Sequence, residues 1–260
     1  MQYFQESIVL ILENERQEIM KMKSLNYSYR KTLYFLVAFM TVFATAPLMQ
    51  SCDLDNDGDN YCIYPSSPNA VVTVKTAADN TVYLQLDDST TLLPLNLKEH
   101  PFNGKEVRAF VTIREARDSN PPYTKSVYVS TIDSILTKPS VATLGDKNTE
   151  VYGNDPVEIY KDFPTVCEDN YLTLAIGTVW GQPAKAHLVN LVTGVNPDDP
   201  YEVELRQNAY GDTKGKMGYT TVAFSLKALP KTGGKKVKLK VRFNSFEGEK
   251  TAEFGYRTKD

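Results

Sequence analysis

Residues 235–257 have the sequence KKVKLKVRFNSFEGEKTAEFGYR. Apolar side chains alternate with Lys or Arg from Val237 to Phe243, and this period of two predicts a strand with one buried and one solvated face. The Glu-Gly-Glu turn at 247–249 predicts a hairpin between this strand and a second one over 251–257. An antiparallel sheet with one wet side has this pattern. The stretch therefore predicts an all-β fold around it.

The cations at 235–242 form a basic stripe along one face of the predicted strand. Lysines on an edge strand discourage pairing with another sheet, so we interpret the stripe as the solvated face of an edge strand. The alternative is a patch for an anionic partner, such as lipopolysaccharide or a glycan phosphate. We favour the first interpretation.

The same period of two extends back through the second half of the chain. Six or seven short strands separated by turn signals predict a two-sheet antiparallel sandwich, immunoglobulin-like, over residues 151–260. About this length of chain suffices to bury one core. The further strand-like runs lie at 171–179, 186–193, 201–206 and 219–226.

Prolines and glycines punctuate residues 139–168, which we interpret as a linker with one short strand at 157–160 and a domain boundary near residue 150. The chain before the linker has strand-like runs and no convincing amphipathic helix. Closing such strands into a small barrel removes exposed edges, so we predict an OB-like barrel over 67–150. Its strand-like runs lie at 71–75, 81–86, 106–115 and 126–136.

The first 51 residues are predicted to be a signal peptide. Residues 32–46 carry no charge and follow a basic region, as in a secretory signal. This apolar core is shorter than the ~20 residues that a membrane-spanning helix needs. Residues 1–19 contain four glutamates, which is unusual ahead of a signal peptide. We therefore expect translation to begin at Met20 or Met22.

The apolar core ends in LMQSC, residues 48–52, a small residue directly before a cysteine. This resembles the lipobox of bacterial lipoproteins, in which the cysteine receives a diacylglyceryl group. We predict lipidation of Cys52, with ordinary signal cleavage as the alternative. Stable membrane anchoring takes two acyl chains, and a diacylglyceryl cysteine supplies them.

An acidic run, DLDNDGDN at 53–60, follows Cys52. Its aspartates and glycine fit the start of a calcium loop, but Tyr64 stands where the bidentate Glu is required. We therefore predict an acidic tether over 52–66. It resembles the export signal of surface-exposed lipoproteins of Bacteroides-like bacteria. The predicted location is the outer membrane, facing outward.

Cys62 and Cys167 remain after the lipidated cysteine. An even pair in an oxidising compartment predicts a disulfide between them, and two separate buried thiols are the alternative. A zinc site needs four closely spaced ligands, and the sequence offers none, so we expect no metal.

The composition is that of an ordinary globular protein, with 260 residues, 42% hydrophobic residues and a net charge of −3. A near-neutral charge argues against a nucleic-acid partner. His187 lies in an alternating apolar run and His100 in a loop, so we expect structural roles for them. Without a recognisable catalytic motif, the sequence predicts no enzyme and no cofactor.

Several runs together are similar to one family. They are EDNYLTL at 168–174, HLVNLV at 187–192, ELRQNAYGD at 204–212 and the closing hairpin at 243–256. With the lipobox-like segment and the acidic tether, they resemble the NigD-like lipoproteins, which combine an N-terminal OB-type domain with a C-terminal β-sandwich. The resemblance implies a link to a bacteriocin locus, with immunity as a suggested role. It carries over no catalytic or binding residue.

Two functions remain open. One is a surface-anchored protein that binds an unknown protein or peptide and protects the cell, as in bacteriocin immunity. The other is a glycan-binding accessory lipoprotein, in which exposed tyrosines and Trp180 line a groove.

Overall fold

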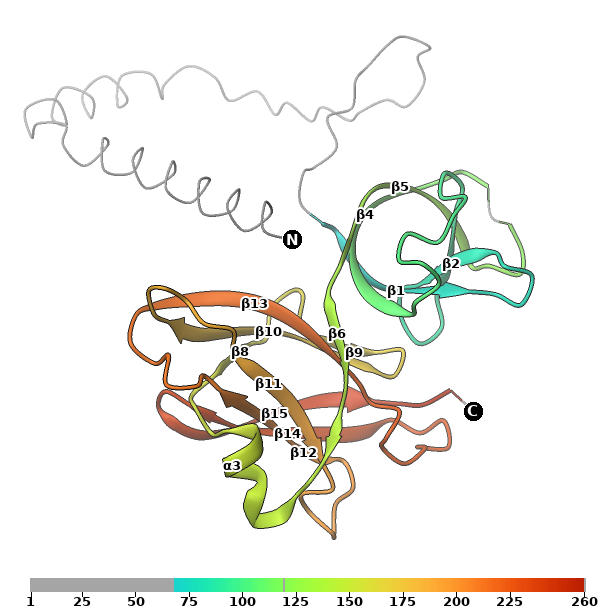
Figure 1. Cartoon of the computed structure of the whole chain (residues 1–260). Helices are drawn as coiled ribbons and strands as arrows, with labels where there is room; N and C mark the ends of the chain where they lie inside the picture. Colours follow the sequence, from blue (N-terminus) through green and yellow to red (C-terminus); the bar gives the residue numbers. More distant parts are fainter. Residues whose placement is uncertain (1–67, 119, 260) are drawn as a thin grey trace, which may run out of the picture. The chain divides into compact units, whose positions relative to one another are not determined.

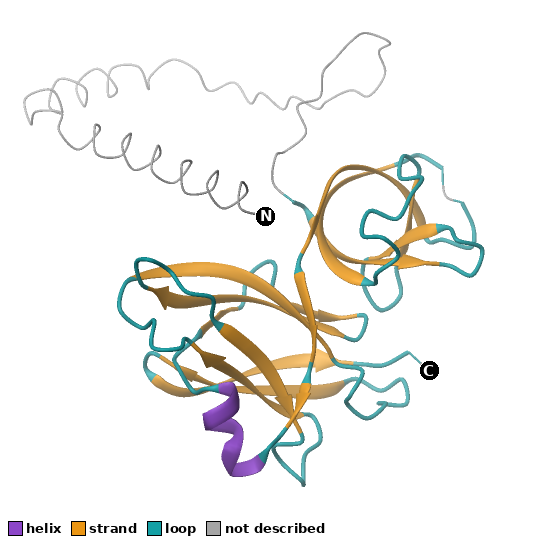
Figure 2. Ribbon diagram, viewed as in Figure 1, coloured by secondary structure: helices purple, strands orange, loops and turns teal. Residues whose placement is uncertain are grey.

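The computed structural model describes residues 68–118 and 120–259 (Figure 1). The predicted signal peptide, the tether, Cys52 and Cys62 lie outside these residues. The described chain is almost entirely strands and loops, with one short helix (Figure 2). Within it, no helix combines the length and apolarity needed to cross a membrane.

The first strands close into a five-stranded barrel in the order β1-β2-β3-β5-β4. Its interior is filled by alternating apolar residues such as Val72, Val74 and Val111, which are fully buried. The predicted OB-like barrel is therefore confirmed. The strands are β1 (Ala70–Thr76), β2 (Val82–Gln85), β3 (Thr91–Pro94), β4 (Val107–Glu115) and β5 (Lys125–Ser134).

The rest of the chain forms two sheets that face each other. The first sheet has the order β6-β13-β10-β8, with β9 also paired to β10, and the second has the order β15-β14-β12-β11-β7. The bounds are β6 (Leu136–Pro139), β7 (Val141–Ala142), β8 (Glu158–Tyr160), β9 (Val166–Glu168), β10 (Tyr171–Trp180), β11 (Leu188–Thr193), β12 (Glu202–Asn208), β13 (Lys216–Ser225), β14 (Val237–Ser245) and β15 (Gly248–Tyr256). A 3-10 turn (Gly145–Lys147) and helix α3 (Asn148–Tyr152) connect β7 to β8.

The sandwich core comes from the apolar half of each alternating strand. Leu172, Leu174 and Ile176 of β10 are buried against residues such as Leu239 and Val241 of β14. The sandwich and the β14–β15 hairpin are thus as predicted. Three pairings in the sandwich are parallel, namely β6–β13, β7–β11 and β12–β14, so its sheets are mixed.

The domain boundary lies earlier than we expected. Strand β6 pairs with β13 and β7 pairs with β11, so residues 136–142 belong to the sandwich. The boundary predicted near residue 150 is therefore wrong, and the barrel ends near Ile135. Pro139 is compatible with strand pairing because it ends a strand at the edge of a sheet.

The basic stripe also lies elsewhere than we expected. Strand β14 has neighbours on both sides, β15 and β12, so it is not an edge strand. Its lysines therefore do not protect a sheet edge.

Barrel and sandwich form one compact unit, and a buried arginine lies where they meet. Arg108 of β4 is fully buried; its Nη1 donates to Thr73 Oγ1 at 3.0 Å, and its Nε donates to Thr173 Oγ1 of β10 at 3.2 Å. Nearby, Lys75 Nζ of the barrel lies 2.7 Å from Asp169 of the sandwich. These contacts cover one end of the outer face of the first sheet and leave the other end to solvent.

Candidate functional site

The outer face of the first sheet carries a row of side chains set by strand register. On β13 the outward positions are Ala223, Thr221, Tyr219 and Met217, from the end covered by the barrel to the open end. Ala223 is fully buried, whereas 69% of Tyr219 and 40% of Met217 are exposed. Along this one strand, the outer face of the sheet therefore changes from buried side chains to exposed aromatic and apolar side chains.

A glycine on β10 makes room for an aromatic ring. Gly177 lies opposite Tyr219, and a Cβ on Gly177 would lie 2.8 Å from Cε2 of Tyr160. The Tyr160 ring therefore packs directly on the backbone of β10. It meets Tyr219 edge to face, with ring centroids 5.2 Å apart and planes at 68°. Burial and then a hydrogen bond with Tyr219 raise the pKa of Tyr160, so this phenol stays neutral near pH 7.

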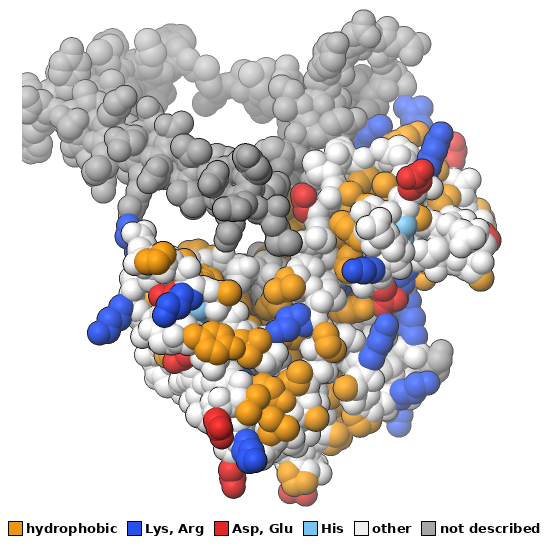
Figure 3. Space-filling view, viewed as in Figure 1, with side chains coloured by type: hydrophobic (Ala, Val, Ile, Leu, Met, Phe, Trp, Pro, Cys, Tyr) orange, Lys and Arg blue, Asp and Glu red, His pale blue; other side chains and the backbone are white. Residues whose placement is uncertain are grey.

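The loop after β8 extends this aromatic surface to the barrel. Phe163 is 59% exposed, and its ring lies 6.2 Å from that of Phe110 on the outside of β4. Thr165 holds the loop in place, because its hydroxyl donates to the carbonyl of Tyr160 and accepts from the Ala175 amide. We call Phe110, Phe163, Tyr160, Tyr219 and Met217 the aromatic stripe. Figure 3 shows hydrophobic side chains on the molecular surface, among Lys and Arg.

Trp180 is not part of this stripe. Its ring stacks on His187, with centroids 5.1 Å apart and planes at 20°, and it lies over Gly218, whose added Cβ would meet the indole at 2.7 Å. Gly218 is paired with Thr178, which bonds to the opposite sheet, so the indole lies on the inner side. The expectation that Trp180 and the exposed tyrosines line one groove is therefore wrong.

His187 has the structural role expected for it. Its Nδ1 lies 3.1 Å from Nε2 of Gln207 on the neighbouring strand β12, and its Nε2 lies 3.4 Å from Asp212 Oδ2. Asp212 accepts backbone N–H bonds from Lys185 and Gly181. These bonds, with a smaller contribution from His187, lower the pKa of Asp212. Asp212 ends the run ELRQNAYGD, but its role was not predictable, because its two amide partners lie in the loop after β10.

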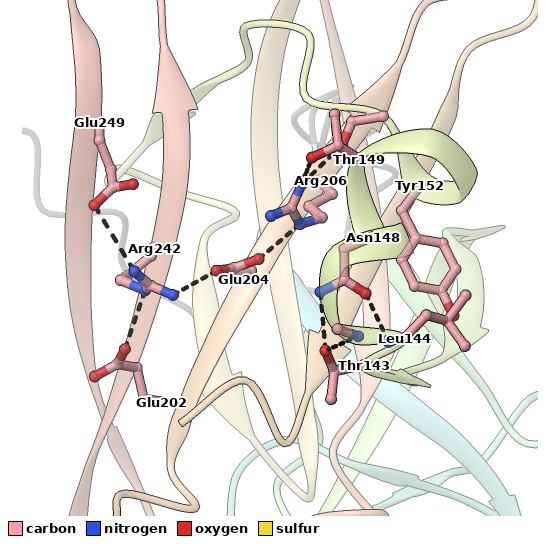
Figure 4. A network of polar contacts seen from close by, with 12 residues as sticks. Thr143, Leu144, Asn148, Thr149, Tyr152, Glu202, Glu204, Arg206, Arg242 and Glu249 are labelled. Carbon is pink, nitrogen blue, oxygen red and sulfur yellow. Dashed lines mark hydrogen bonds and ion pairs between the residues drawn. The ribbon is translucent and has the colours of Figure 1, made fainter. Parts of the chain in front are cut away.

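The outer face of the second sheet is charged and internally paired (Figure 4). Arg242 on β14 forms ion pairs with Glu202, at 3.0 Å, and with Glu204, both on β12. Glu204 also accepts from Nε of Arg206 at 2.6 Å, and Arg206 donates to the Gly153 carbonyl beside α3. The figure shows these charges alternating in sign across the sheet, and a small depression lies among them.

Two lysines of the basic stripe have partners as well. Lys240 pairs with Asp199 at 3.0 Å, and Lys238 pairs with Glu253 at 2.9 Å. This agrees with a solvated face rather than a patch for an anionic partner, because three of the five cations at 235–242 are neutralised by nearby carboxylates.

The remaining candidate residues are dispersed. Cys167 lies on β9, and burial raises the pKa of its thiol to about 12, which makes it a poor nucleophile. Its predicted partner Cys62 is outside the described residues, so the disulfide stays a prediction. His100 accepts from the amides of Phe102 and Gly104, as a loop residue. Among the described residues, no group of three or more His, Cys, Asp or Glu could hold a metal ion.

Two family models match the chain. The NigD-like N-terminal OB domain matches residues 71–135, and the NigD-like C-terminal beta sandwich domain matches residues 140–256. The first match ends at residue 135 and the second begins at residue 140, which agrees with a domain boundary directly after Ile135. A search of curated proteins finds no match.

Solved structures from Parabacteroides and Bacteroides share the fold. A protein from Parabacteroides distasonis, provisionally called toxin-related, is 36% identical, with a TM-score of 0.60 over 72% of this chain and 92% of its own. A NigD-like immunity protein from Bacteroides caccae is 18% identical, with a TM-score of 0.51 over 75% and 99%. A protein from Bacteroides fragilis, provisionally called a lipoprotein, is 16% identical, with a TM-score of 0.50 over 74% and 98%.

Proposed function

Since the chain belongs to the NigD-like family, we propose that it is a lipid-anchored, non-catalytic binding protein of the outer membrane that protects its own cell from a protein toxin. The observation that carries the binding role is the aromatic stripe. It exposes Tyr219 and Met217 on a sheet face and Phe163 on the adjoining loop, and the other end of the same sheet face is already buried by the barrel.

Exposed aromatic side chains on rigid elements are suited to recognition. Tyr and Phe offer large contact areas with few rotatable bonds, and such residues dominate the energy of protein interfaces. Exposed apolar patches rimmed by polar residues often mark sites where a protein binds its partner. The stripe is therefore the surface on which we place the partner.

The anchor rests on the sequence. Cys52 follows the apolar core at the position of a lipidated cysteine, and the acidic run after it favours outward display. The fold relative from B. fragilis carries a provisional lipoprotein name, which agrees with this but concerns that protein. Anchoring would hold the aromatic stripe at the envelope, where a toxin first meets the cell.

A toxin is preferred over other ligands because of the relatives. The P. distasonis protein, at 36% identity, has a toxin-related name, and the B. caccae protein, which shares the fold, is called an immunity protein. The absence of catalysis is our inference from residue chemistry. Both ring nitrogens of His187 are already engaged, and the Cys167 thiol is buried with a raised pKa.

The test is a deletion strain challenged with bacteriocins from related strains. We expect the deletion to sensitise the cells, and the wild-type gene to restore resistance. Two complementing variants separate the parts of the proposal: Cys52→Ala removes the anchor, and Tyr219→Ala with Phe163→Ala removes the centre of the stripe. Both should fail to restore resistance while the protein accumulates normally. Equal resistance of deletion and parent to every toxin would contradict the protective role.

A further inference from the structure

One edge of the sandwich differs from the other edges that the structure describes. Strand β15 is nine residues long, whereas the other edges are formed by β6 with four residues, β7 with two and β8 with three. Short strands, prolines and bulges are the usual protection against pairing with another chain. Pro139 ends β6, and the loop between β8 and β9 contains Pro164. Strand β15 has no such protection, because it contains no proline and its register with β14 runs without a bulge from Gly248 to Tyr256.

The backbone groups of β14 show which way those of β15 point. The Lys240 amide donates to the Tyr201 carbonyl, and the Asn244 carbonyl accepts from the Val157 amide, so the even-numbered residues of β14 face away from β15. Its odd-numbered residues therefore bond to their even-numbered partners on β15. Because the direction of the backbone groups alternates along a strand, those at 249, 251, 253 and 255 point away from the sheet.

These outward backbone groups form an open ladder. The four residues concerned are exposed, and no backbone group within residues 68–118 and 120–259 pairs with their amides or carbonyls. Such a ladder accepts one kind of partner, an extended chain that supplies the missing hydrogen bonds. The residues are Glu249, Thr251, Glu253 and Gly255.

Inward-pointing charge, which disfavours pairing at an edge, is confined to one end of β15. Lys250 lies next to the turn, and its ammonium is 2.8 Å from Glu247. The later inward side chains are Ala252, Phe254 and Tyr256, which pack with the core of the sandwich. The middle of the strand therefore presents no buried charge to a pairing chain.

The edge is complementary to itself in antiparallel orientation. The two-fold register that pairs all four outward residues places Thr251 opposite Glu253 of a second copy, and Glu249 opposite its Gly255. No two carboxylates then face each other, and the Thr251 hydroxyl can donate to Glu253. A shift of two residues in either direction places Glu249 opposite Glu253, or Glu253 opposite Glu253. Like charges directly opposite are destabilising, so charge selects the first register.

We propose that two copies of this chain pair through β15, antiparallel and with Thr251 opposite Glu253, to form one continuous sheet across a two-fold axis. Each copy uses its open edge in the pairing, so the assembly closes after two chains and does not continue into a fibre. This inference goes beyond the proposed function, because it concerns a second copy rather than a toxin and uses the second sheet rather than the aromatic stripe.

Sedimentation velocity over a range of concentrations tests the pairing, on the full chain carrying Cys52→Ser, which prevents lipidation. We expect a concentration-dependent shift from monomer to dimer, with no larger species. Amide hydrogen exchange followed by NMR should locate the contact. The amides of 249, 251, 253 and 255 should gain protection as the dimer forms, whereas those of 250, 252 and 254 should be protected at every concentration.

Charge substitutions at Thr251 test the register separately from folding. Thr251→Glu places a carboxylate opposite Glu253 twice across the two-fold axis and should weaken the dimer about ten-fold or more, whereas Thr251→Lys should strengthen it. Within the monomer the effects are reversed, because Thr251 lies opposite Arg242 of β14. There a glutamate gains an opposite charge and a lysine meets a like charge. A change in monomer stability therefore does not imitate the expected change in dimer affinity.

Two further variants complete the test. Thr251→Pro removes an outward amide without removing a bond to β14, so it should abolish the dimer while the monomer still folds. Thr213→Glu makes the same charge change as Thr251→Glu in an exposed loop and should leave the dimer unchanged.

Three results would overturn the proposal. A monomer at every concentration would leave the β15 edge to a strand of another protein. Protection of the outward amides at every concentration would mean that another segment of the same chain covers the edge. A dimer that Thr251→Glu and Thr251→Lys change in the same direction, or that Thr251→Pro retains, would be formed through a different surface.

Discussion

The two outer faces of the sandwich are both wet, yet they differ in what they offer a partner. The second sheet presents charges, but Arg206, Arg242 and Lys238 are held by glutamates of the same sheet, and Lys240 is held by Asp199 in the loop before β12. The first sheet presents exposed aromatic and apolar side chains, such as Tyr219 and Met217, that the rest of the chain does not cover. Exposure alone is therefore a poor guide to function. Groups whose interactions are unsatisfied within the chain are the ones available for recognition.

The prediction with the largest expected effect concerns the end of the first sheet's outer face that the barrel covers. Arg108→Ala removes the guanidinium that bonds Thr73 and Thr173 and lies close to Asp169. Removing one member of a buried polar network costs about 3–5 kcal/mol, so the free energy of unfolding should fall by that order. Denaturant titration measures it.

Arg117→Ala, which truncates an exposed arginine just after β4, is the control and should change stability by less than about 0.5 kcal/mol. If Arg108→Ala and Arg117→Ala unfolded at the same denaturant concentration, the covered end would not depend on this arginine.

A pair of glycines sharpens the contrast between the two sides of the first sheet. Gly218→Ala places a Cβ 2.7 Å from the half-buried Trp180 ring, which is stacked on His187 and cannot easily move. Overpacking of this kind costs about 1–3 kcal/mol. Gly177→Ala places a Cβ 2.8 Å from Tyr160, whose ring can swing into solvent. We expect a smaller loss of stability for Gly177→Ala, measured by thermal unfolding, but weaker binding at the stripe.

The reverse order, with Gly177→Ala the less stable variant, would mean that the Tyr160 ring is held as firmly as Trp180. The open end of the first sheet would then be a structural element rather than an adaptable surface.

Local patterns made most of the strands predictable. The alternation at 237–243 and the turn at 247–249 act over a few residues, so the β14–β15 hairpin follows from them directly. Strands β6 and β7 were not predictable in this way. Each is short, and each is a strand only because β13 or β11, far along the chain, supplies its hydrogen bonds.

The site was less predictable than the fold for a related reason. The run EVRAFVTIRE correctly places Val107, Ala109 and Val111 on one face, which puts Arg108 on the other. That second face is buried by another part of the chain, which no local pattern reveals. In the same way, only the cross-strand register shows that Tyr160 and Tyr219 meet over Gly177.

A smaller effect tests whether the charges of the second sheet are in fact satisfied by one another. Glu204 accepts from both Arg206 and Arg242, and a double-mutant cycle of Glu204→Gln and Arg242→Gln measures the coupling between the latter pair. We expect about 0.5–1 kcal/mol, because the pair is only partly buried. The coupling should decrease at high salt. A coupling near zero would mean that the charge of Arg242 is not satisfied within the sheet.

The prediction with the smallest expected effect compares two glutamates, one from each sheet. Glu168 on β9 forms no ion pair with a described residue; burial and then the nearby Asp87 and Asp88, opposed by Arg108, raise its pKa from 4.5 to about 6. The folded protein therefore holds this proton more tightly than the unfolded chain does. Stability is unaffected below about pH 4.5, falls as the pH rises through 6, and stays lower above it.

Glu168→Gln removes this loss of stability at higher pH, because the amide of glutamine does not ionise. The variant should be more stable than the wild type above pH 6, and the difference should shrink toward pH 4.5, as measured by denaturant titration across that range. Glu204→Gln should instead destabilise the protein at neutral pH, since Glu204 accepts from two arginines. The same chemical change would then have opposite signs on the two sheets. Equal signs at neutral pH would remove the distinction between a face whose charges are paired internally and a face whose charges are not.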